Sequence, residues 1–345
     1  MKKQLFIILL LVSSASLFAQ NRELTSPEAS QAASIMQRIG ITDITIKYHS
    51  PLAKSRTIWG DLVPYNEVWR AGANQNTVIT FSTDVKIEGK NLAAGSYGLH
   101  MIPSQKEWII IFNKNSGAWG SFFYDQKDDA LRVTVTPQSA EMQDWLSYTF
   151  TAVQPESTVA LLRWEKMAVP FKISIDVPET VYQNMKQELT DLYGFFWQPH
   201  NQAAAFCVQK NIHLDQAMLW VDKSISIQKN FTNLNTKSRL LAKQGKQQEA
   251  DAIKAEAVTM ADETQMNAYG YELMGQEKSK EAIDVFRSNV KKYPASWNVY
   301  DSYAEALEKT GDKKGAVSNY KTALSKAPEN QKKRITDTIN KLEGK

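Results

Sequence analysis

Hydrophobic residues recur at every second position in short segments between Asp43 and Asp176, and this period is typical of β-strands. In Thr42–His49, for example, Ile44, Ile46 and Tyr48 are spaced by two. The other expected strands are Thr77–Phe81, Val85–Ile87, Tyr97–Ile102, Trp108–Phe112, Leu131–Val135, Trp145–Val153, Val159–Trp164 and Phe171–Ile175. Turn-forming residues separate these segments. About nine short strands without helices between them predict an all-β domain over residues 26–176, an antiparallel sandwich or barrel.

The period becomes helical after Pro178, and Glu179–Leu192 predicts a connecting helix within residues 177–197. From about Gln198 onward the chain repeats itself at an interval of about 34 residues. The clearest recurrence is that of Gly270, Ala282, Phe286 and Pro294 as Ala304, Ala316, Tyr320 and Pro328. This pattern resembles the tetratricopeptide repeat, in which two helices touch through small residues.

Repeats are expected over residues 198–230, 231–262, 263–296 and 297–330, although the first of these segments also fits unrelated helices. Residues 331–345 follow, with Arg334–Leu342 as a polar helix that caps the stack. Stacked helix pairs form a solenoid, so the predicted fold class is an all-β N-terminal domain followed by an all-α, tetratricopeptide-like solenoid.

The N-terminal segment has the pattern of a secretory signal peptide. Lys2 and Lys3 precede the apolar run Leu5–Val12, which is too short for a spanning helix. Ala19 is a suitable last residue before a cleavage site, so residues 1–19 are expected to be removed. No later stretch reaches the roughly 18 apolar residues of a membrane span. We therefore expect a periplasmic or extracellular protein without a membrane span.

Composition narrows the classes of function without indicating one. Of the 345 residues, 43% are hydrophobic and 23% are charged, which is ordinary for a globular protein. A net charge of +4 is too small to indicate a nucleic-acid partner. The single cysteine, Cys207, excludes a disulfide within the chain, and its apolar neighbours predict that it is buried.

The sequence contains no motif that we can assign to catalysis or to a cofactor. It has no Walker loop and no GxGxxG or GxSxG motif. The four histidines, His49, His100, His200 and His213, lack the spacing of zinc ligands. We therefore assign no cofactor, no metal and no catalytic residue. Two weaker alternatives are a calcium site at Asp128–Asp129 and a metal site shared by His49 and His100.

The segment Ser50–Thr77 is the most unusual part of the β half, because it is too long for an ordinary hairpin loop. Arginine beside tryptophan can form a cation–π contact, and its guanidinium can also hold a carboxylate or phosphate. The candidate ligand-binding residues are Arg56, Trp59, Trp69, Arg70 and Asn74, together with His49 and His100. The alternative is a structural loop that fills one end of the sandwich, with Arg70 bonded to main-chain carbonyls.

The β half also resembles a family of secreted bacterial proteins, domain of unknown function 2911. The resemblance rests on Glu67–Asn74 followed by Thr77, on Ala94–Tyr97, on Glu107 and Trp108 with Asn113, and on Tyr48–Pro51 through Arg56. It covers about residues 26–176, and the helical tail is similar to that of many members. The family pattern places a glycine before the arginine, where this chain has Lys54 and Ser55. Because the family has no assigned function, the resemblance implies no catalytic residue.

Three functions fit these observations. The first is a non-enzymatic secreted binding or scaffold protein whose repeat groove holds a segment of a protein partner. The second is a binder of a carbohydrate or another small ligand in the β domain. It requires Trp59, Trp69, Arg70 and Asn74 to converge on an open cleft.

The third function is a hydrolase, for which the candidate acid–base groups are His49, Asp61, Glu67 and His100. Nothing in the spacing of these residues requires such an activity. We therefore favour the binding protein, since the repeat array supports it.

Overall fold

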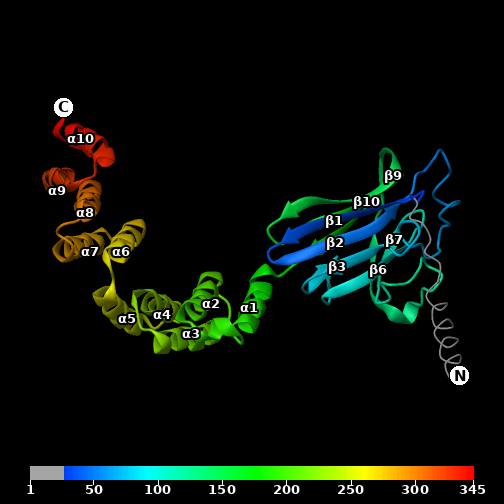
Figure 1. Cartoon of the computed structure of the whole chain (residues 1–345), viewed down its shortest axis with the longest axis horizontal. Coiled ribbons are helices and arrows are strands. Elements are labelled where there is room, and N and C mark those ends of the chain that lie inside the picture. The colour runs from blue at the N-terminus through cyan, green and yellow to red at the C-terminus, as the bar shows by residue number, and fades with distance from the viewer. Residues whose placement is uncertain (1–26) are drawn as a thin grey trace, which may run out of the picture. The chain divides into compact units, whose positions relative to one another are not determined.

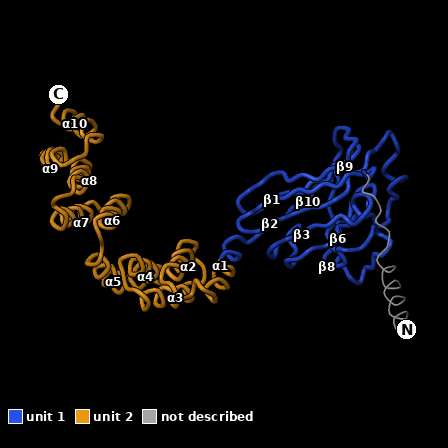
Figure 2. Tube along the Cα trace, in the orientation of Figure 1, with its two compact units in different colours: residues 1–181 blue, residues 182–345 orange. Residues whose placement is uncertain are grey.

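A computed structural model of the chain describes residues 27–345, so the expected signal segment Met1–Ala19 lies outside the described residues. The chain divides into two compact units, and the division falls after Val181 (Figure 2). The first, here called the β unit, consists of antiparallel sheets, and the second, the helical unit, consists of stacked helices (Figure 1). The predicted fold class is confirmed. No helix within residues 27–345 is long and apolar enough to cross a membrane.

The described part of the β unit contains ten strands in two sheets. The strands are β1 (Gln31–Ile39), β2 (Thr42–Ser50), β3 (Val78–Phe81), β4 (Val85–Ile87), β5 (Lys90–Leu92), β6 (Gly95–Ile102), β7 (Trp108–Asn113), β8 (Asp129–Val135), β9 (Gln138–Gln154) and β10 (Ser157–Ser174). One sheet has the order β1-β2-β3-β6-β7-β8 and the other the order β5-β4-β10-β9. Every neighbouring pair of strands is antiparallel.

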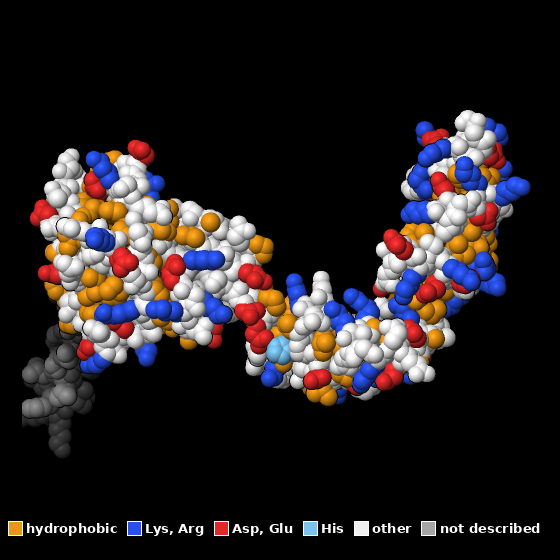
Figure 3. All heavy atoms as spheres, turned by 180° about the vertical axis from the view of Figure 1, so that it is seen from behind, with side chains coloured by type: hydrophobic (Ala, Val, Ile, Leu, Met, Phe, Trp, Pro, Cys, Tyr) orange, Lys and Arg blue, Asp and Glu red, His pale blue; other side chains and the backbone are white. Residues whose placement is uncertain are grey.

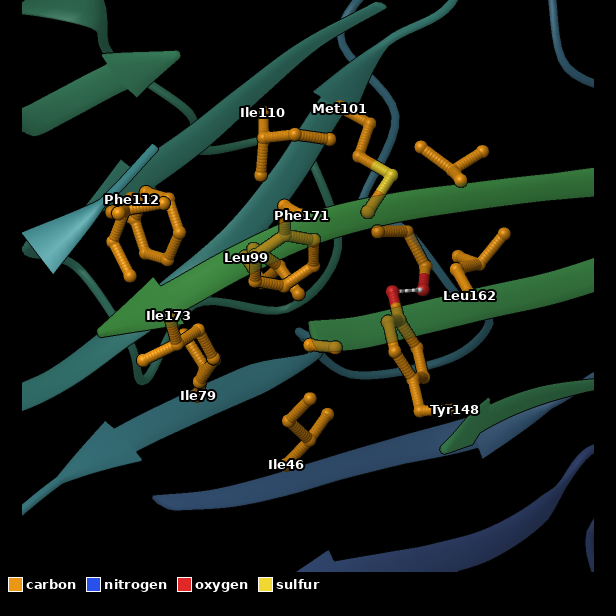
Figure 4. Packing of buried hydrophobic residues seen from close by; sticks show 14 of the residues in the cluster. Ile46, Ile79, Leu99, Met101, Ile110, Phe112, Tyr148, Leu162, Phe171 and Ile173 are labelled. Atoms are coloured by element: carbon orange, nitrogen blue, oxygen red, sulfur yellow. Dashed lines mark hydrogen bonds between the residues drawn. The ribbon is translucent and has the colours of Figure 1, made fainter. Parts of the chain in front are cut away.

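One hydrophobic core lies between the two sheets, and it explains the alternation in the sequence. Ile46 of β2, Ile79 of β3 and Leu99 of β6 project from the six-stranded sheet (Figure 4). They face Phe171 and Ile173, which project from β10 of the other sheet. Burying each of these side chains contributes about 1.5–3 kcal/mol. The β unit is therefore a sandwich of two sheets.

The structure differs from the sequence pattern at three strands. β1 is an edge strand whose burial alternates, but Gln37 holds one of its less exposed positions and Met36 an exposed one, so its hydrophobicity does not alternate clearly. β5 has only three residues, too few to show a period. The predicted strands 159–164 and 171–175 are parts of the single strand β10. Pro170 lies between the part of β10 that pairs with β9, which ends at Ala168, and the part that pairs with β4, which begins at Ile173. Its missing N–H therefore removes no ladder hydrogen bond.

Ten α-helices follow the sandwich in the described residues. They are α1 (Val177–Glu188), α2 (Trp197–Lys210), α3 (Leu214–Ile227), α4 (Phe231–Lys243), α5 (Gln247–Met260), α6 (Glu263–Gly275), α7 (Ser279–Lys292), α8 (Trp297–Lys309), α9 (Lys313–Lys326) and α10 (Glu329–Glu343). The 3₁₀-helix η2 (Leu192–Phe195) connects α1 to α2. From α2 onward the helices pack as consecutive antiparallel pairs, and α10 packs on α9.

The residues that recur in the sequence lie where the two helices of a pair touch. A Cβ atom at Gly270 of α6 would lie 2.5 Å from the ring of Phe286 on α7, which leaves no room for a larger side chain. At the corresponding positions of the next pair, Ala304 of α8 and Tyr320 of α9 are both buried. Close helix contact through small residues is therefore the cause of the repeat.

The helical unit has several small cores rather than one large one. One cluster is built around Tyr182, Cys207 and Trp220, and another around Tyr320 and Ile335 near the C-terminus. Cys207 is buried, as its neighbours in the sequence predict. Each cluster joins helices that are close together in the sequence, which is the arrangement expected of a solenoid.

Candidate binding sites

The two tryptophans of the β2–β3 loop (residues 51–77) pack together inside the sandwich. The ring of Trp59 lies 4.8 Å from that of Trp108, 5.8 Å from that of Trp164 and 5.7 Å from that of Trp69, measured between centroids. Trp69 also stacks on Trp164, at 6.0 Å. Both loop tryptophans pack against the hydrophobic core. This part of the loop fills one end of the sandwich, and its indoles do not meet across an open cleft.

Arg56 is held by its own loop. Its Nε donates to the carbonyl oxygen of Ala53 at 3.0 Å, and its Nη2 donates to that of Leu52 at 2.6 Å. The two preceding residues, Lys54 and Ser55, have φ angles of +51° and +56°. Only glycine adopts this left-handed region at no steric cost, which gives a physical reason for the glycine expected here.

His49 and Asn74 meet at a carboxylate that precedes β1. The Nδ2 of Asn74 donates to Glu28 Oε2 at 2.6 Å, and His49 Nε2 lies 3.3 Å from the same oxygen. Asn74 itself has a φ of +55°, a conformation that asparagine tolerates better than most residues. These two candidate residues therefore connect the loop to the segment that enters β1.

Arg70 and His100 are brought to the outer face of the six-stranded sheet, opposite the core. Trp69 and Met101 form an isolated antiparallel bridge and exchange two main-chain hydrogen bonds, both of 2.8 Å. The side chains of these two residues point into the core. Because side chains alternate along extended chains, the neighbouring Arg70 and His100 point the other way.

A pocket of about 250 Å³ lies beside Arg70 on this outer face. Two loops line it: the β2–β3 loop with Leu62, Val63, Pro64, Glu67, Val68, Trp69 and Arg70, and the β7–β8 loop (residues 114–128) with Ser121 and Phe122. We call it the Arg70 pocket. Ser121 and Phe122 were not singled out by the sequence, because nothing in the stretch Trp119–Tyr124 relates it to the distant β2–β3 loop. Only the pairing of strands β6 and β7 shows that the two loops meet.

His100 is buried beside this pocket. It is 2% exposed, its Nδ1 lies 3.3 Å from the hydroxyl of Ser121, and its ring lies 5.3 Å from that of Tyr124. Burial lowers its pKa to about 4, against a smaller opposing effect of Asp129. The imidazole is therefore neutral at neutral pH.

The Ser121–His100 contact resembles part of a catalytic triad, which also needs a carboxylate bonded to the imidazole. Asp129 is engaged elsewhere: it accepts hydrogen bonds from Asn113, Tyr124 and Arg132 at 2.6–2.8 Å. No group of three or more possible metal ligands occurs in residues 27–345.

A groove in the helical unit forms the second candidate site. A hollow of about 510 Å³ is lined by Met185 of α1, by Gln202, Ala205, Phe206 and Gln209 of α2, and by Arg239 of α4. A smaller hollow of about 260 Å³ shares Met185 and Gln202 with it and extends to Leu189 and Tyr193. We call the two together the α2 groove. The helices α2 and α4 are the first members of their pairs, so the groove runs along the stack from one pair to the next.

Charged side chains are dispersed over the surface of both units. On the face shown in Figure 3, Lys and Arg side chains lie among Asp and Glu side chains. Some of these basic and acidic side chains form ion pairs, such as Lys229–Glu256 at 2.6 Å and Arg334–Asp301 at 2.9 Å. That face does not present the contiguous basic patch that is typical of a nucleic-acid-binding surface.

The segments that build the core of the sandwich and the Arg70 pocket belong to one stretch of sequence that matches a known protein family. Residues 30–173 match the family described as "Protein of unknown function (DUF2911)". This match confirms the resemblance that the sequence motifs indicate. It spans β1 through almost all of β10, so the DUF2911 segment and the described sandwich coincide.

Within the DUF2911 segment, the stretch Trp69–Thr77 is held in place by hydrogen bonds from side-chain hydroxyls to the main-chain carbonyl of Ala71. Ala71 is buried with a φ of +53°. Its carbonyl accepts hydrogen bonds from the hydroxyl of Thr77, at 3.1 Å, and from that of Tyr148, at 2.8 Å. The bond from Tyr148 is drawn in Figure 4. A Cβ at Gly72 would lie 2.6 Å from the Thr77 hydroxyl, so glycine is required there. Arg70 differs from these neighbours, because no hydrogen bond or ion pair joins its side chain to another described residue.

The helical unit is similar to tetratricopeptide-repeat structures. A structure of MamA from Desulfovibrio magneticus RS-1 is 14% identical, with 43% of this chain and 93% of that chain covered and a TM-score of 0.28. YrrB, described as a TPR protein with an unusual peptide-binding site, is 13% identical, with 46% and 92% covered and a TM-score of 0.28. Another MamA structure is 15% identical, with 46% and 92% covered and a TM-score of 0.31. No curated protein matches the chain.

Proposed function

We propose that this chain is a non-enzymatic binding protein whose helical unit holds an extended segment of a protein partner in the α2 groove. The groove itself is the observation that supports the proposal. Its lining combines apolar side chains from Met185 and Phe206 with exposed amides from Gln202 and Gln209. Amide groups can both donate to and accept from an extended main chain, and the apolar side chains provide contact area.

Arg239, a charged residue that lines the groove, gives the groove a preference for a negatively charged partner segment. Arg239 is exposed and forms no hydrogen bond or ion pair with another described residue. Beyond the other end of the groove, the segment after α1 exposes large apolar side chains, among them Phe195 and Phe196 at 76% and 57%. Exposed apolar side chains next to a groove are typical of interaction surfaces. We infer that the partner segment is apolar and carries an acidic residue that reaches Arg239.

This proposal predicts where a partner can be cross-linked. A photo-crosslinking amino acid placed at Gln202 is expected to label a discrete protein in cells that produce the chain. A Phe206→Glu change in the same chain is expected to reduce this labelling at least tenfold, because it puts a charge where the partner's apolar side chain would pack. The yield of the cross-linked band on a denaturing gel measures the effect.

The matched control is the same photo-crosslinker at Lys223, an exposed residue of α3 that does not line the groove. Equal labelling from positions 202 and 223, or labelling that survives Phe206→Glu, would contradict the proposal. Circular dichroism of the Phe206→Glu chain separates loss of binding from loss of the fold.

A role outside the cytoplasm is part of the same proposal. It rests on the sequence of residues 1–19, in which two lysines precede an apolar run and Ala19 precedes the expected cut. The mature chain is therefore expected to begin at Gln20. Mass spectrometry of the N-terminal peptide, from whole cells and from a released periplasmic or culture fraction, measures this. A chain that keeps Met1–Ala19 in every fraction would argue against export.

A further inference from the structure

The Arg70 pocket contains a cationic group that forms no ion pair with another described residue. Arg70 Nε is buried without a hydrogen-bond partner, and none of the ion pairs in residues 27–345 includes this side chain. The aliphatic stem packs against the β7–β8 loop, where a Cβ at Gly120 would lie 3.4 Å from Arg70 Cδ. Buried cations are normally paired, because an unpaired one loses hydration without compensation.

Two arginines of the same loop differ in this respect. Arg56 donates to two main-chain carbonyls and is satisfied, whereas Arg70 has no such acceptor. The guanidinium of Arg70 therefore keeps its fork of N–H donors for another group. A second polar group of the pocket is Ser121, whose hydroxyl is 3.3 Å from His100 Nδ1.

We propose that the Arg70 pocket binds a small carboxylate with a short apolar chain, the carboxylate on the Arg70 guanidinium and the chain between Leu62, Pro64 and Phe122. A carboxylate matches the planar guanidinium with two parallel hydrogen bonds. The volume of about 250 Å³ lies just below the range of about 300–1,000 Å³ that is common for drug-sized ligands, which limits the chain to a few carbon atoms.

The lining distinguishes a carboxylate from a phosphate. Arg70 is the only cationic side chain that lines the pocket in the described part of the chain, and Glu67 is the only anionic one. A doubly charged phosphate would meet one cation and one anion, and it would leave the apolar walls without contact. A singly charged acid with an apolar chain uses both the Arg70 guanidinium and the apolar walls, and it meets less repulsion from Glu67 than a doubly charged phosphate would. This site lies wholly within the β unit, so it is independent of the proposal for the α2 groove.

The experiment follows the Arg70 Nε–H signal by NMR in the full chain labelled with ¹⁵N-arginine, and comparison with the Arg70→Gln chain assigns that signal. Hexanoate represents a free acid, and N-acetyl-leucine represents the C-terminal carboxylate of a peptide. Each is titrated beside its uncharged amide, hexanamide or N-acetyl-leucinamide. We expect at least one acid to shift the Arg70 Nε–H signal and to bind at least tenfold more tightly than its amide.

Two arginine variants test the position of the charge. Arg70→Gln is expected to weaken binding of the acid at least tenfold, observed through the tryptophan indole N–H signals. Arg56→Gln is the matched control and is expected to leave it unchanged. If Arg70→Gln does not fold, Arg70→Lys takes its place, because it keeps the charge but loses the fork and should weaken binding by a smaller factor.

The two titrations distinguish between the two possible sources of the carboxylate. Binding of hexanoate alone identifies a free acid as the ligand class, and binding of N-acetyl-leucine alone identifies a peptide terminus. The proposal is wrong if both acids bind no better than their amides, or if the Arg70 and Arg56 variants bind the acid equally well. The comparison of acid with amide needs only the unmodified chain, so it decides the question even if every Arg70 variant is unstable.

Discussion

Replacing Trp108 with alanine is expected to lower the free energy of unfolding of the β unit by about 3–5 kcal/mol. The Trp108 side chain is completely buried, and its indole N–H donates to the carbonyl of Ser104 at 3.1 Å. Its ring also contacts Trp59 at 4.8 Å, and Trp59 in turn contacts Trp69 and Trp164. Removing Trp108 therefore leaves a cavity and weakens the attachment of the β2–β3 loop.

Urea unfolding of the full chain, followed by tryptophan fluorescence, measures this effect, because six of the nine tryptophans lie in the β unit. Circular dichroism at a helical wavelength follows the helical unit in the same samples and is expected to change little. Trp119→Ala is the matched control. Trp119 is 53% exposed, and its replacement should change stability by no more than about 0.5 kcal/mol. Equal losses from the two substitutions would show that the four indoles are not a structural cluster.

Acid is expected to destabilise the β unit by about 3 kcal/mol through His100 alone. Burial lowers the pKa of His100 from its ordinary 6.5 to about 4 in the folded chain. Between these two pH values the unfolded chain binds a proton that the folded chain does not. The free energy of unfolding therefore falls as the pH falls from about 6.5 to about 4, and the contribution of neutral His100 is fully present only above this range.

Urea midpoints at pH 7, 6, 5 and 4 measure this dependence in the full chain. His100→Asn removes the titrating group, so its stability should fall less steeply over the same pH range, even if it starts lower. If His100→Asn retains the full slope, the acid sensitivity belongs to other groups.

The central strands of the sandwich could be predicted because the period of two in hydrophobicity and the abundance of Ile, Val and aromatic residues both indicate β-strands. β2, β3 and β7 place Ile, Val and aromatic residues on the core face, and their neighbours were recognised in the same way. β1 was not, because Gln37 holds one of its less exposed positions and Met36 an exposed one, so the alternation in its burial is not matched by a clear alternation in residue type. Val159–Trp164 and Phe171–Ile175 were expected to be separate strands, yet β10 runs through both because it changes its partner between Ala168 and Ile173. Partner changes are a property of the sheet and leave no trace in local sequence.

The helical repeats were easier to predict than the binding sites. The interval of the repeat follows from one contact, between small and large residues such as Gly270 and Phe286, and that contact recurs in the sequence. Arg70 was recognised as a candidate from its unusual loop, but Ser121, which lines the same pocket, lies 51 positions away, and their proximity becomes visible only when the strands are paired. The residues of the α2 groove are ordinary surface residues of helices. They line one groove only because α2 and α4 pack against each other in the folded chain.

The sheet order has a consequence for the way in which the two units acquire their structure as the chain is made. Ile87 of β4 pairs with Ile173 of β10, so the second sheet cannot close over the core until almost the whole β unit has been synthesised. In the helical unit, by contrast, α6 and α7 form a complete pair within Glu263–Lys292. Contacts between distant residues slow folding, whereas local contacts accelerate it. The apolar face of the first sheet therefore stays exposed to solvent until β10 has been synthesised. Each helical pair, by contrast, can form as soon as its second helix is complete.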